Sequence, residues 1–261
     1  MLVLLSPAKR LNTERLPLTD VFSLPALLPE SARLMKTTRN LSQRAIAELM
    51  HISPDLAKLN AGRYKELTTD LSPQNARHAV TTFSGDAYLG LDIGSFAEDD
   101  LLWAQDHLAI LSGLYGLLRP LDLIQPHRLE MGTRLKTRRG RSLYDFWGDR
   151  INKLLAERMA ALGTDVIVNL ASKEYFKGLG PKALDARVIT PTFLETKGGE
   201  SRVLSMFAKQ ARGMMTRYIL LNRIAEPEQL KDFDAAGYGF RPGLSDGDEL
   251  VFERQQPPPK R

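Results

Sequence analysis

Polar side chains able to bind an anion or move a proton follow three short apolar runs, at residues 2–5, 108–111 and 166–168. Short continuous apolar runs are typical of parallel strands buried on both faces. The carboxyl ends of parallel strands share one sheet edge, where open α/β sheets hold their ligands. The sequence therefore predicts a pocket at that edge. Its candidate residues are Ser6, Lys9, Tyr115, Arg119, Arg128, Glu130, Asn169, Ser172, Glu174 and Tyr175.

The residue types in this predicted pocket allow acid–base chemistry on an anionic ligand. Glu130 or Glu174 could act as a general base, while Lys9 and Arg128 hold a negatively charged group. The alternative is structural: Glu130 pairs with Arg128, and Ser172 caps the helix that follows it. The chain has no triad, Walker loop or dinucleotide fingerprint. Catalysis therefore stays open, a non-enzymatic role is favoured, no cofactor is expected, and a nucleotide or nucleobase-like ligand fits best.

Two segments carry positive charge without any acidic residue. Residues 201–223 contain Lys209, Arg212 and Arg223, which fall within roughly 60° of one another on a helical wheel. A second cluster consists of Arg134, Lys136, Arg138, Arg139 and Arg141. Either cluster could be a solvated face, but surfaces usually mix both signs. We expect both clusters to bind duplex or branched DNA in a salt-sensitive, sequence-independent way.

Composition narrows the remaining possibilities. The 261 residues include 36 Lys and Arg against 31 Asp and Glu, a net charge of +5. The absence of cysteine excludes disulfides, thiolate chemistry and cysteine-ligated clusters. The four histidines are scattered and lack facial-triad spacing, so no metal site is predicted. No apolar run approaches the roughly 20 residues of a membrane span. These features predict a cytoplasmic protein that does not contact membranes, and its oligomeric state stays open.

The pattern along the chain predicts a mixed α/β fold with a central, largely parallel sheet flanked by helices. We expect one domain over residues 1–254, with a helical insertion at about 31–107 and a flexible tail at 255–261. Residues 85–91 read as a loop, 143–162 as one helix and 173–179 as a short helix. Pro191 should interrupt strand structure between 187–190 and 192–195. A hairpin-like pair closes the fold at 237–240 and 249–252.

Seven sequence motifs carry a family resemblance, and they follow one another from the first residue to about 254. They are SPAK at 6–9, LSGLYGLLRPLDLI at 111–124, RLEMGTRL at 128–135, LYDFWGD at 143–149, NLASKEYF at 169–176, SMFAKQARGMMTRY at 205–218 and GDELVF at 247–252. With these motifs the chain resembles the YaaA family of bacterial peroxide stress proteins. Arg10 and His127 stand where that family usually has threonine and tyrosine.

The resemblance implies a cytoplasmic protein that limits hydrogen peroxide damage and restrains reactive, unincorporated iron. It also implies a basic cleft and DNA affinity through a helix-hairpin-helix-like element. The best candidate for that element is the segment 56–65, with Asn60, Arg63 and Lys65 as DNA contacts. A plain helix-turn-helix connection is the alternative interpretation of the segment. The other function kept open is an enzyme or sensor for a nucleotide in the strand-end pocket.

Overall fold

The computed structural model describes residues 1–14, 17–180 and 184–258. Its main sheet has the strand order β11-β12-β9-β8-β1-β5-β6, with β10 paired to β9. The strands from β12 to β5 run parallel, and β6, β10 and β11 are antiparallel. This confirms the mixed α/β fold. The strand bounds are β1 (Leu2–Leu5), β5 (Leu108–Ser112), β6 (Gly116–Leu118), β8 (Val166–Leu170), β9 (Arg187–Lys197), β10 (Glu200–Arg202), β11 (Gly239–Phe240) and β12 (Glu249–Gln255).

The three apolar runs form the centre of the sheet, as predicted. β1 lies between β5 and β8, and its four residues are at most 1% exposed. Leu5 is in register with Ile110 of β5 and Leu170 of β8. The polar turns that follow these strands therefore start at one level of the sheet. This register creates the site described below.

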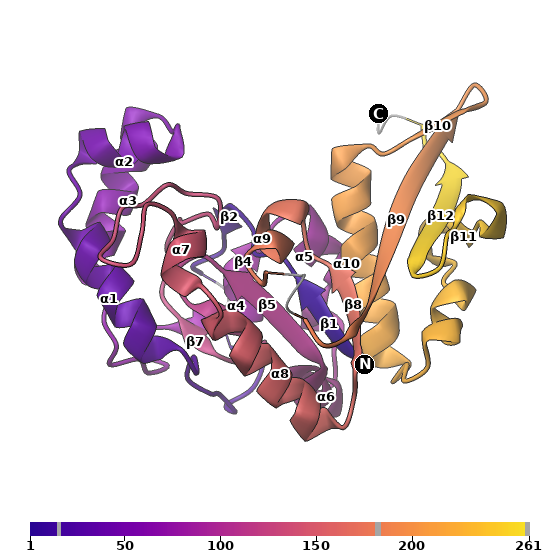
Figure 1. Ribbon diagram of the computed structural model, residues 1–261, viewed down its shortest axis with the longest axis horizontal. Coiled ribbons are helices and arrows are strands. Elements are labelled where there is room, and N and C mark those ends of the chain that lie inside the picture. Colours follow the sequence, from indigo (N-terminus) through magenta and orange to yellow (C-terminus); the bar gives the residue numbers. More distant parts are fainter. Residues whose placement is uncertain (15–16, 181–183, 259–261) are drawn as a thin grey trace.

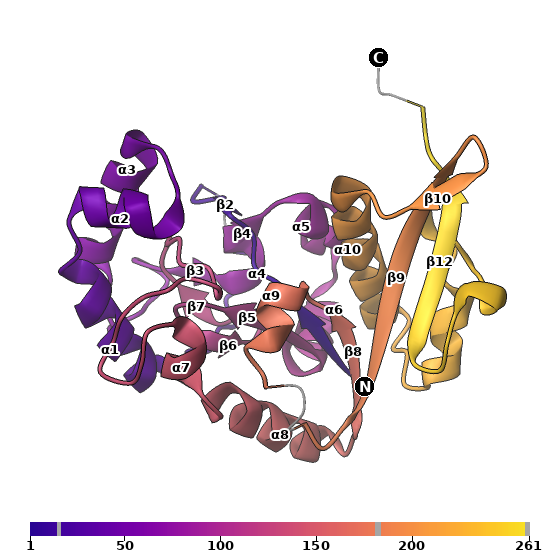
Figure 2. The same ribbon diagram turned by 45° about the horizontal axis from the view of Figure 1, so that its top comes forward.

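Helices cover both faces of the sheet (Figure 1). One face carries α5, α6 and α10, and the other carries α7, α8 and α9. Helices α1–α3 form a separate group on one side, opposite β9–β12 (Figure 2). The helix bounds are α1 (Leu28–Arg39), α2 (Gln43–Met50), α3 (Pro54–Glu66), α4 (Ala79–Thr82), α5 (Asp86–Leu91), α6 (Glu98–His107), α7 (Leu143–Trp147), α8 (Arg150–Leu162), α9 (Lys173–Lys177) and α10 (Ser205–Leu221).

Two small antiparallel pairs complete this part of the fold. β2 (Arg10–Leu11) pairs with β4 (Phe83–Ser84), and β3 (Arg77–His78) pairs with β7 (Leu123–Ile124). The β2–β4 pair brings the segment after β1 against the start of α5. Among the described residues, no helix is long and apolar enough to span a bilayer.

The loop predicted at 85–91 is wrong, because this segment forms α5. One of its two glycines, Gly90, serves helix packing. A Cβ on Gly90 would lie 2.1 Å from the carbonyl oxygen of Gln210, and one on Gly213 would lie 1.8 Å from that of Ala87. Glycine at both positions lets the backbones of α5 and α10 touch.

The strand break predicted at Pro191 is also wrong. β9 runs through Pro191 as one strand of 11 residues. The amide of Thr190 donates to Asp248 on the β12 side, so the position of Pro191 faces the β8 side. Pairing with β8 has already ended at Ile189. The proline therefore stands where its missing N–H is not needed.

The helix predicted over 143–162 is two helices, α7 and α8, because Gly148 has φ 52° and turns the chain between them. The turn predicted within 56–65 is wrong, since these residues lie in the unbroken helix α3. The turn before α3 falls at 51–53 instead, and Ser53 caps the helix. In the region where the tail was expected, Gln255 still belongs to β12, and 259–261 lie outside the described residues.

Candidate functional site

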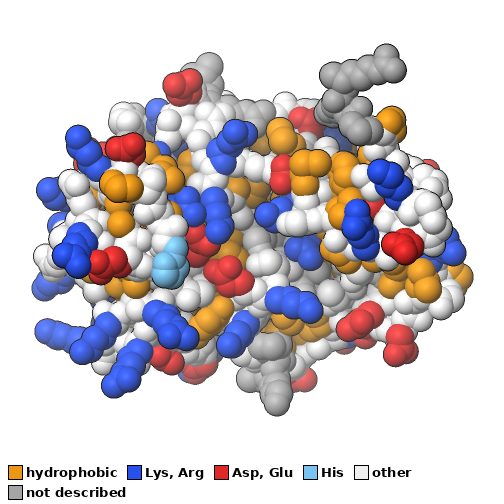
Figure 3. All heavy atoms as spheres, turned by 90° about the horizontal axis from the view of Figure 1, so that it is seen from above, with side chains coloured by type: hydrophobic (Ala, Val, Ile, Leu, Met, Phe, Trp, Pro, Cys, Tyr) orange, Lys and Arg blue, Asp and Glu red, His pale blue; other side chains and the backbone are white. Residues whose placement is uncertain are grey.

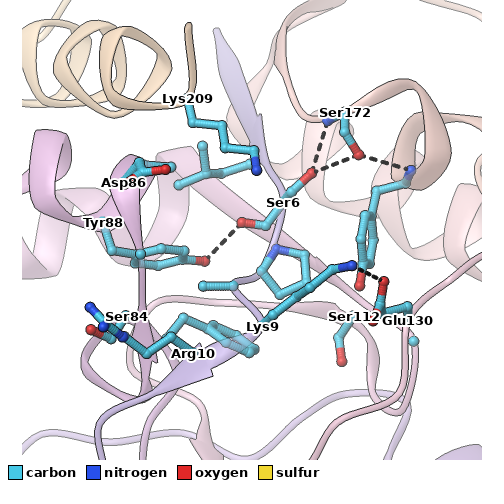
Figure 4. A pocket seen from close by; sticks show the side chains of 18 of the residues that line it. Ser6, Lys9, Arg10, Ser84, Asp86, Tyr88, Ser112, Glu130, Ser172 and Lys209 are labelled. Carbon is cyan, nitrogen blue, oxygen red and sulfur yellow. Dashed lines mark hydrogen bonds and ion pairs between the residues drawn. The ribbon is translucent and has the colours of Figure 1, made fainter. Parts of the chain in front are cut away.

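A cavity of about 430 Å³, here called the strand-end cavity, opens at the carboxyl ends of β1, β5 and β8. Leu5, Ser112 and Leu170 mark these strand ends on its wall. The other walls come from α5, α9, α10 and the loop 127–130 (Figure 4). The parallel register thus produces a pocket at the predicted sheet edge. Of the predicted residues, it gathers Ser6, Lys9, Arg128, Glu130, Ser172, Glu174 and Tyr175.

A hydrogen-bonded network joins β1, α5 and α9 at the floor of the cavity. The Ser6 hydroxyl accepts from the Ser172 amide at 2.8 Å and donates to the Ser172 hydroxyl at 3.4 Å. The Tyr88 hydroxyl donates to the Ser6 carbonyl at 3.0 Å. Burial raises the pKa of Tyr88, so this phenol stays a neutral donor. Ser172 also caps α9 by accepting from the Tyr175 amide, as the structural alternative expected. The serines therefore shape the site, and among the described residues neither hydroxyl is hydrogen-bonded to a His, Asp or Glu side chain.

Glu130 is held between two cations. The amino group of Lys9 lies 2.7 Å from one carboxylate oxygen, and Arg128 donates to the other at 3.1–3.2 Å. This is the Arg128–Glu130 pairing that the sequence left open. Both carboxylate oxygens of Glu130 are thus engaged by cations of the fold. The arrangement favours a structural clamp over a general base.

Glu174 and Tyr175 extend the wall along α9. Glu174 accepts from the Gly132 amide at 2.8 Å, which ties α9 to the loop 128–135. Tyr175 is buried, and burial raises the pKa of its hydroxyl. At neutral pH Tyr175 therefore presents an uncharged aromatic ring to the cavity.

Three predicted pocket residues do not line the cavity. Tyr115 is fully buried, and its hydroxyl accepts from the Gln125 amide. Asn169 turns its oxygen to the Ala171 amide. Arg119 follows β6, which runs antiparallel to β5 and so returns to the opposite sheet edge, where it lies 3.6 Å from Asp106. The expectation for Arg119 ignored the direction of the returning strand, whereas Tyr115 and Asn169 are buried and engaged by backbone amides.

The cations of the segment 201–223 are divided between the two ends of α10. Lys209 and Arg212 belong to α10 and line the strand-end cavity. Arg223 does not share their face, because α10 ends at Leu221 and Arg223 has φ 52°. Its guanidinium pairs with Asp100 at 2.9 Å and lies over the ring of Trp103. The helical wheel was wrong for Arg223 because it assumed a longer helix.

A second hollow of about 610 Å³, here called the side groove, adjoins the cavity. The two share Lys9, Arg128, Glu130 and Glu174, and the groove continues to the end of α2 and to Arg134. Figure 3 shows Lys and Arg side chains around the central hollow and over the helical group, with acidic side chains among them. The groove is therefore mixed in charge within and basic along its border.

The basic loop, residues 134–141, presents most of its cations to solvent. Arg134, Lys136, Arg138 and Arg141 are exposed, and among the described residues their side chains have no acidic partner. Buried Leu135 alternates with its charged neighbours, as in an extended segment with one face against the core. Arg139 is the exception: it pairs with Glu30 at 2.5 Å and lies over Phe146.

The residues predicted on α3 differ in exposure. Asn60 is 1% exposed and donates to the Leu56 carbonyl, so its side chain does not reach the surface. Arg63 is half-buried, and burial lowers its pKa. Lys65 is exposed.

Sequence reasoning missed several cavity residues, notably Arg10, Ser84, Asp86, Tyr88 and His127. Four of them belong to β2, β4 and α5, short elements whose pattern gave no clear signal. Burial lowers the pKa of His127 to about 4, so its ring is neutral at pH 7. Both positions noted as departures from the family pattern, Arg10 and His127, lie on this wall. Among the described residues, no three His, Cys, Asp or Glu side chains gather as a metal-binding group.

The fold and site define an open α/β protein with a charged pocket at the carboxyl edge of its parallel strands. A family model for peroxide stress protein YaaA matches residues 1–244. The chain therefore belongs to the peroxide stress protein YaaA family.

Proposed function

We propose that this peroxide stress protein acts in the cytoplasm by binding DNA, which it shields from the radicals that peroxide and unincorporated iron generate. The observation that carries the proposal is the basic loop. Arg134 lines the side groove, and the other three exposed cations follow it along the loop; none of the four has an acidic partner among the described residues. Unpaired cations on an extended segment suit successive phosphates of a nucleic acid backbone and carry no sequence preference.

The helical hairpin α2–α3 supports the same contact surface. Its turn at 51–53 places His51 on the side groove, where Arg134 also lies. Lys65 adds an exposed cation on α3. We assign the helix-hairpin-helix-like role to this hairpin as a whole, because the segment 56–65 by itself contains no turn.

Replacing two loop cations tests the DNA contact. The double variant R134Q/R138Q should bind duplex DNA more weakly for every sequence tried. A plot of log affinity against log salt concentration has a negative slope, and this slope should become shallower by roughly 0.9 for each lost phosphate contact. Electrophoretic mobility shift at several salt concentrations measures both effects. The control K153Q/K231Q also removes two cations. Lys153 lies on α8 and Lys231 in the short helix Pro227–Asp232, and neither lines the side groove. Wild-type affinity and slope in R134Q/R138Q would remove the loop from the interface.

Protection of DNA tests the stress function directly. Plasmid DNA exposed to ferrous iron and hydrogen peroxide should be nicked less when wild-type protein is present. R134Q/R138Q should protect less than K153Q/K231Q at the same concentration. Equal protection by both variants would separate the stress role from DNA binding by the loop.

A further inference from the structure

Arg212 is a cation held partly out of water without a counter-charge. Its side chain is half-buried in the wall of the strand-end cavity. Among the described residues, none gives it a hydrogen bond or an ion pair. Burial lowers the pKa of its guanidinium. An unpaired buried charge is costly, so a protein that keeps one usually has a binding partner for it.

Several other arginines that lie partly inside the described fold are paired. Arg128 donates to Glu130 at 3.1 Å, and Arg254 donates to Glu195 at 3.0 Å. Arg158 donates to the backbone carbonyls of Gln105, Asp106 and Leu108. Arg63 also lacks a side-chain partner, but it does not line the cavity. Among the half-buried arginines of the described residues, Arg212 is therefore distinguished by being both unpaired and open to the cavity.

Lys209 provides a second free cation on the same wall. It lies three residues before Arg212, a spacing that places both side chains on one helix face. Figure 4 shows Lys209 reaching from α10 into the cavity, between Asp86 and Ser6. Two cations one helical turn apart can hold a phosphate by charge-assisted hydrogen bonds. Asp86, across from them, can accept from a hydroxyl or amino group of the same ligand.

The remaining walls suit a ring. Phe83, Tyr88, His127 and Tyr175 line the cavity together with aliphatic side chains such as Leu129. His127 is neutral at pH 7, and the phenols are also uncharged, so these walls offer aromatic surface without charge. The volume of about 430 Å³ lies in the range of small-molecule pockets and is too small for a duplex.

We propose that the strand-end cavity binds one phosphate-bearing ligand of the nucleoside monophosphate class. Lys209 and Arg212 hold its phosphate, the aromatic side chains contact its ring, and Asp86 accepts from its hydroxyl or amino groups. The ligand is either a free nucleotide or one unpaired nucleotide of a bound strand, since both present the same chemistry. The proposal does not depend on DNA binding by the basic loop, because none of the loop residues lines the cavity.

The full chain tests this proposal with the four ribonucleoside 5′-monophosphates, the matching nucleosides and inorganic phosphate as probes. Isothermal titration should show at least one monophosphate binding more tightly than its nucleoside and than phosphate alone. R212Q and K209Q should each weaken that binding about tenfold or more, because each removes a charge-assisted hydrogen bond. K153Q removes one cation on α8, outside the cavity, and should leave the affinity unchanged. K209Q changes an exposed residue, so it keeps the test valid if R212Q folds poorly.

A second arm identifies the source of the nucleotide. A duplex with one unpaired nucleotide is compared with the fully paired duplex, in the wild type and in K209Q. If only the unpaired form shows Lys209-dependent binding, the nucleotide comes from DNA. If free monophosphate binds and the protein does not prefer the duplex with the unpaired nucleotide over the fully paired duplex, the ligand is a small molecule. The proposal is overturned if no probe binds, or if binding is equal in wild type, R212Q and K209Q. If R134Q/R138Q keeps its affinity for DNA, the proposed role of the basic loop is contradicted, but the proposal for the cavity is not.

Discussion

His127 illustrates how position changes the chemistry of a single side chain. Its ring is buried between Tyr115 and Phe83, and Nδ1 lies 2.8 Å from the Gln125 carbonyl oxygen. A neutral ring must donate through Nδ1 to make this hydrogen bond, which leaves Nε2 as an acceptor. Burial lowers the pKa of His127 to about 4. The sequence identifies a histidine at this position, but its resistance to protonation comes from burial in the fold.

Acid should destabilise the protein through this histidine. An unfolded chain takes up the proton near pH 6.5, whereas folded His127 takes it up only near pH 4. The unfolded state therefore binds more protons between these values, and stability falls as pH drops from 6.5 to 4. The gap corresponds to about 3 kcal/mol in the free energy of unfolding. Burial lowers the pKa of His78 and His107 in the same direction.

The variant His127→Phe separates this contribution from the others. Urea unfolding at pH 4, 5, 6 and 7.5 should show a shallower pH dependence for the variant than for the wild type. Above pH 7 the two should depend on pH alike, whatever their absolute stabilities. Parallel curves down to pH 4 would show that His127 does not titrate as the fold implies.

Charge pairing is the main residue-scale property that the sequence did not reveal. Lys9, Arg139 and Arg223 all looked free for an anion, yet each has an acidic partner in the fold, more than 100 residues away in the chain. Such distant partners could not be foreseen from local composition, whereas the pairing of Arg128 with Glu130, two residues away, was one of the two alternatives that the sequence left open. The sequence also did not reveal that the Arg212 side chain has no acidic partner among the described residues.

Among the elements, the contact between α5 and α10 positions the cavity wall. Gly90 and Gly213 bring the two helix backbones together, which sets where Lys209 and Arg212 enter the cavity. The strands β1, β5 and β8 were predictable because continuous apolar runs have few alternative interpretations. The helix α5 was not, because six residues that contain Gly90 and follow Gly85 show no clear period. Tertiary contact decides such a segment.

Replacing Gly213 with alanine should disrupt this contact. The new Cβ would meet the Ala87 carbonyl at 1.8 Å, and neither backbone can move away cheaply. We expect a loss of roughly 1–3 kcal/mol in unfolding free energy. Gly62→Ala in α3 is the matched control, because no atom lies within 4 Å of its Cβ position. That change should stabilise the protein by about 0.5–1 kcal/mol. Urea denaturation measures both, and a G213A variant as stable as wild type contradicts the packing argument.

At the scale of the whole molecule, the strands β11 and β12 at one edge are connected to the centre of the sheet through fewer paired residues than the strand β1 is. β1 is buried and hydrogen-bonded on both sides, by β5 and β8. β11 and β12 join the rest of the sheet only through β9, which pairs with β8 over three residues and with β12 over seven. The overall α/β class followed from the sequence, but this unequal support depends on register and could not be read from residue patterns.

Hydrogen exchange should reveal this difference. Amides of β1 and β5 should exchange only through global unfolding, since opening them breaks the centre of the sheet. Amides of β10–β12 should exchange through a local opening of lower free energy. Native-state exchange followed by mass spectrometry at increasing denaturant checks this. Equal protection of β12 and β1 would show that the sheet opens as one unit.

The strand-end cavity draws its walls from almost the whole length of the chain, from Leu5 to Arg212. During synthesis the ribosome releases β1 first and α10 much later, so the early strands wait with an incomplete wall. A nascent chain cannot hold the proposed ligand until α10 has emerged and docked on α5. Occupancy of the cavity would then report that the chain has been made at least as far as α10 and that this helix has closed the wall.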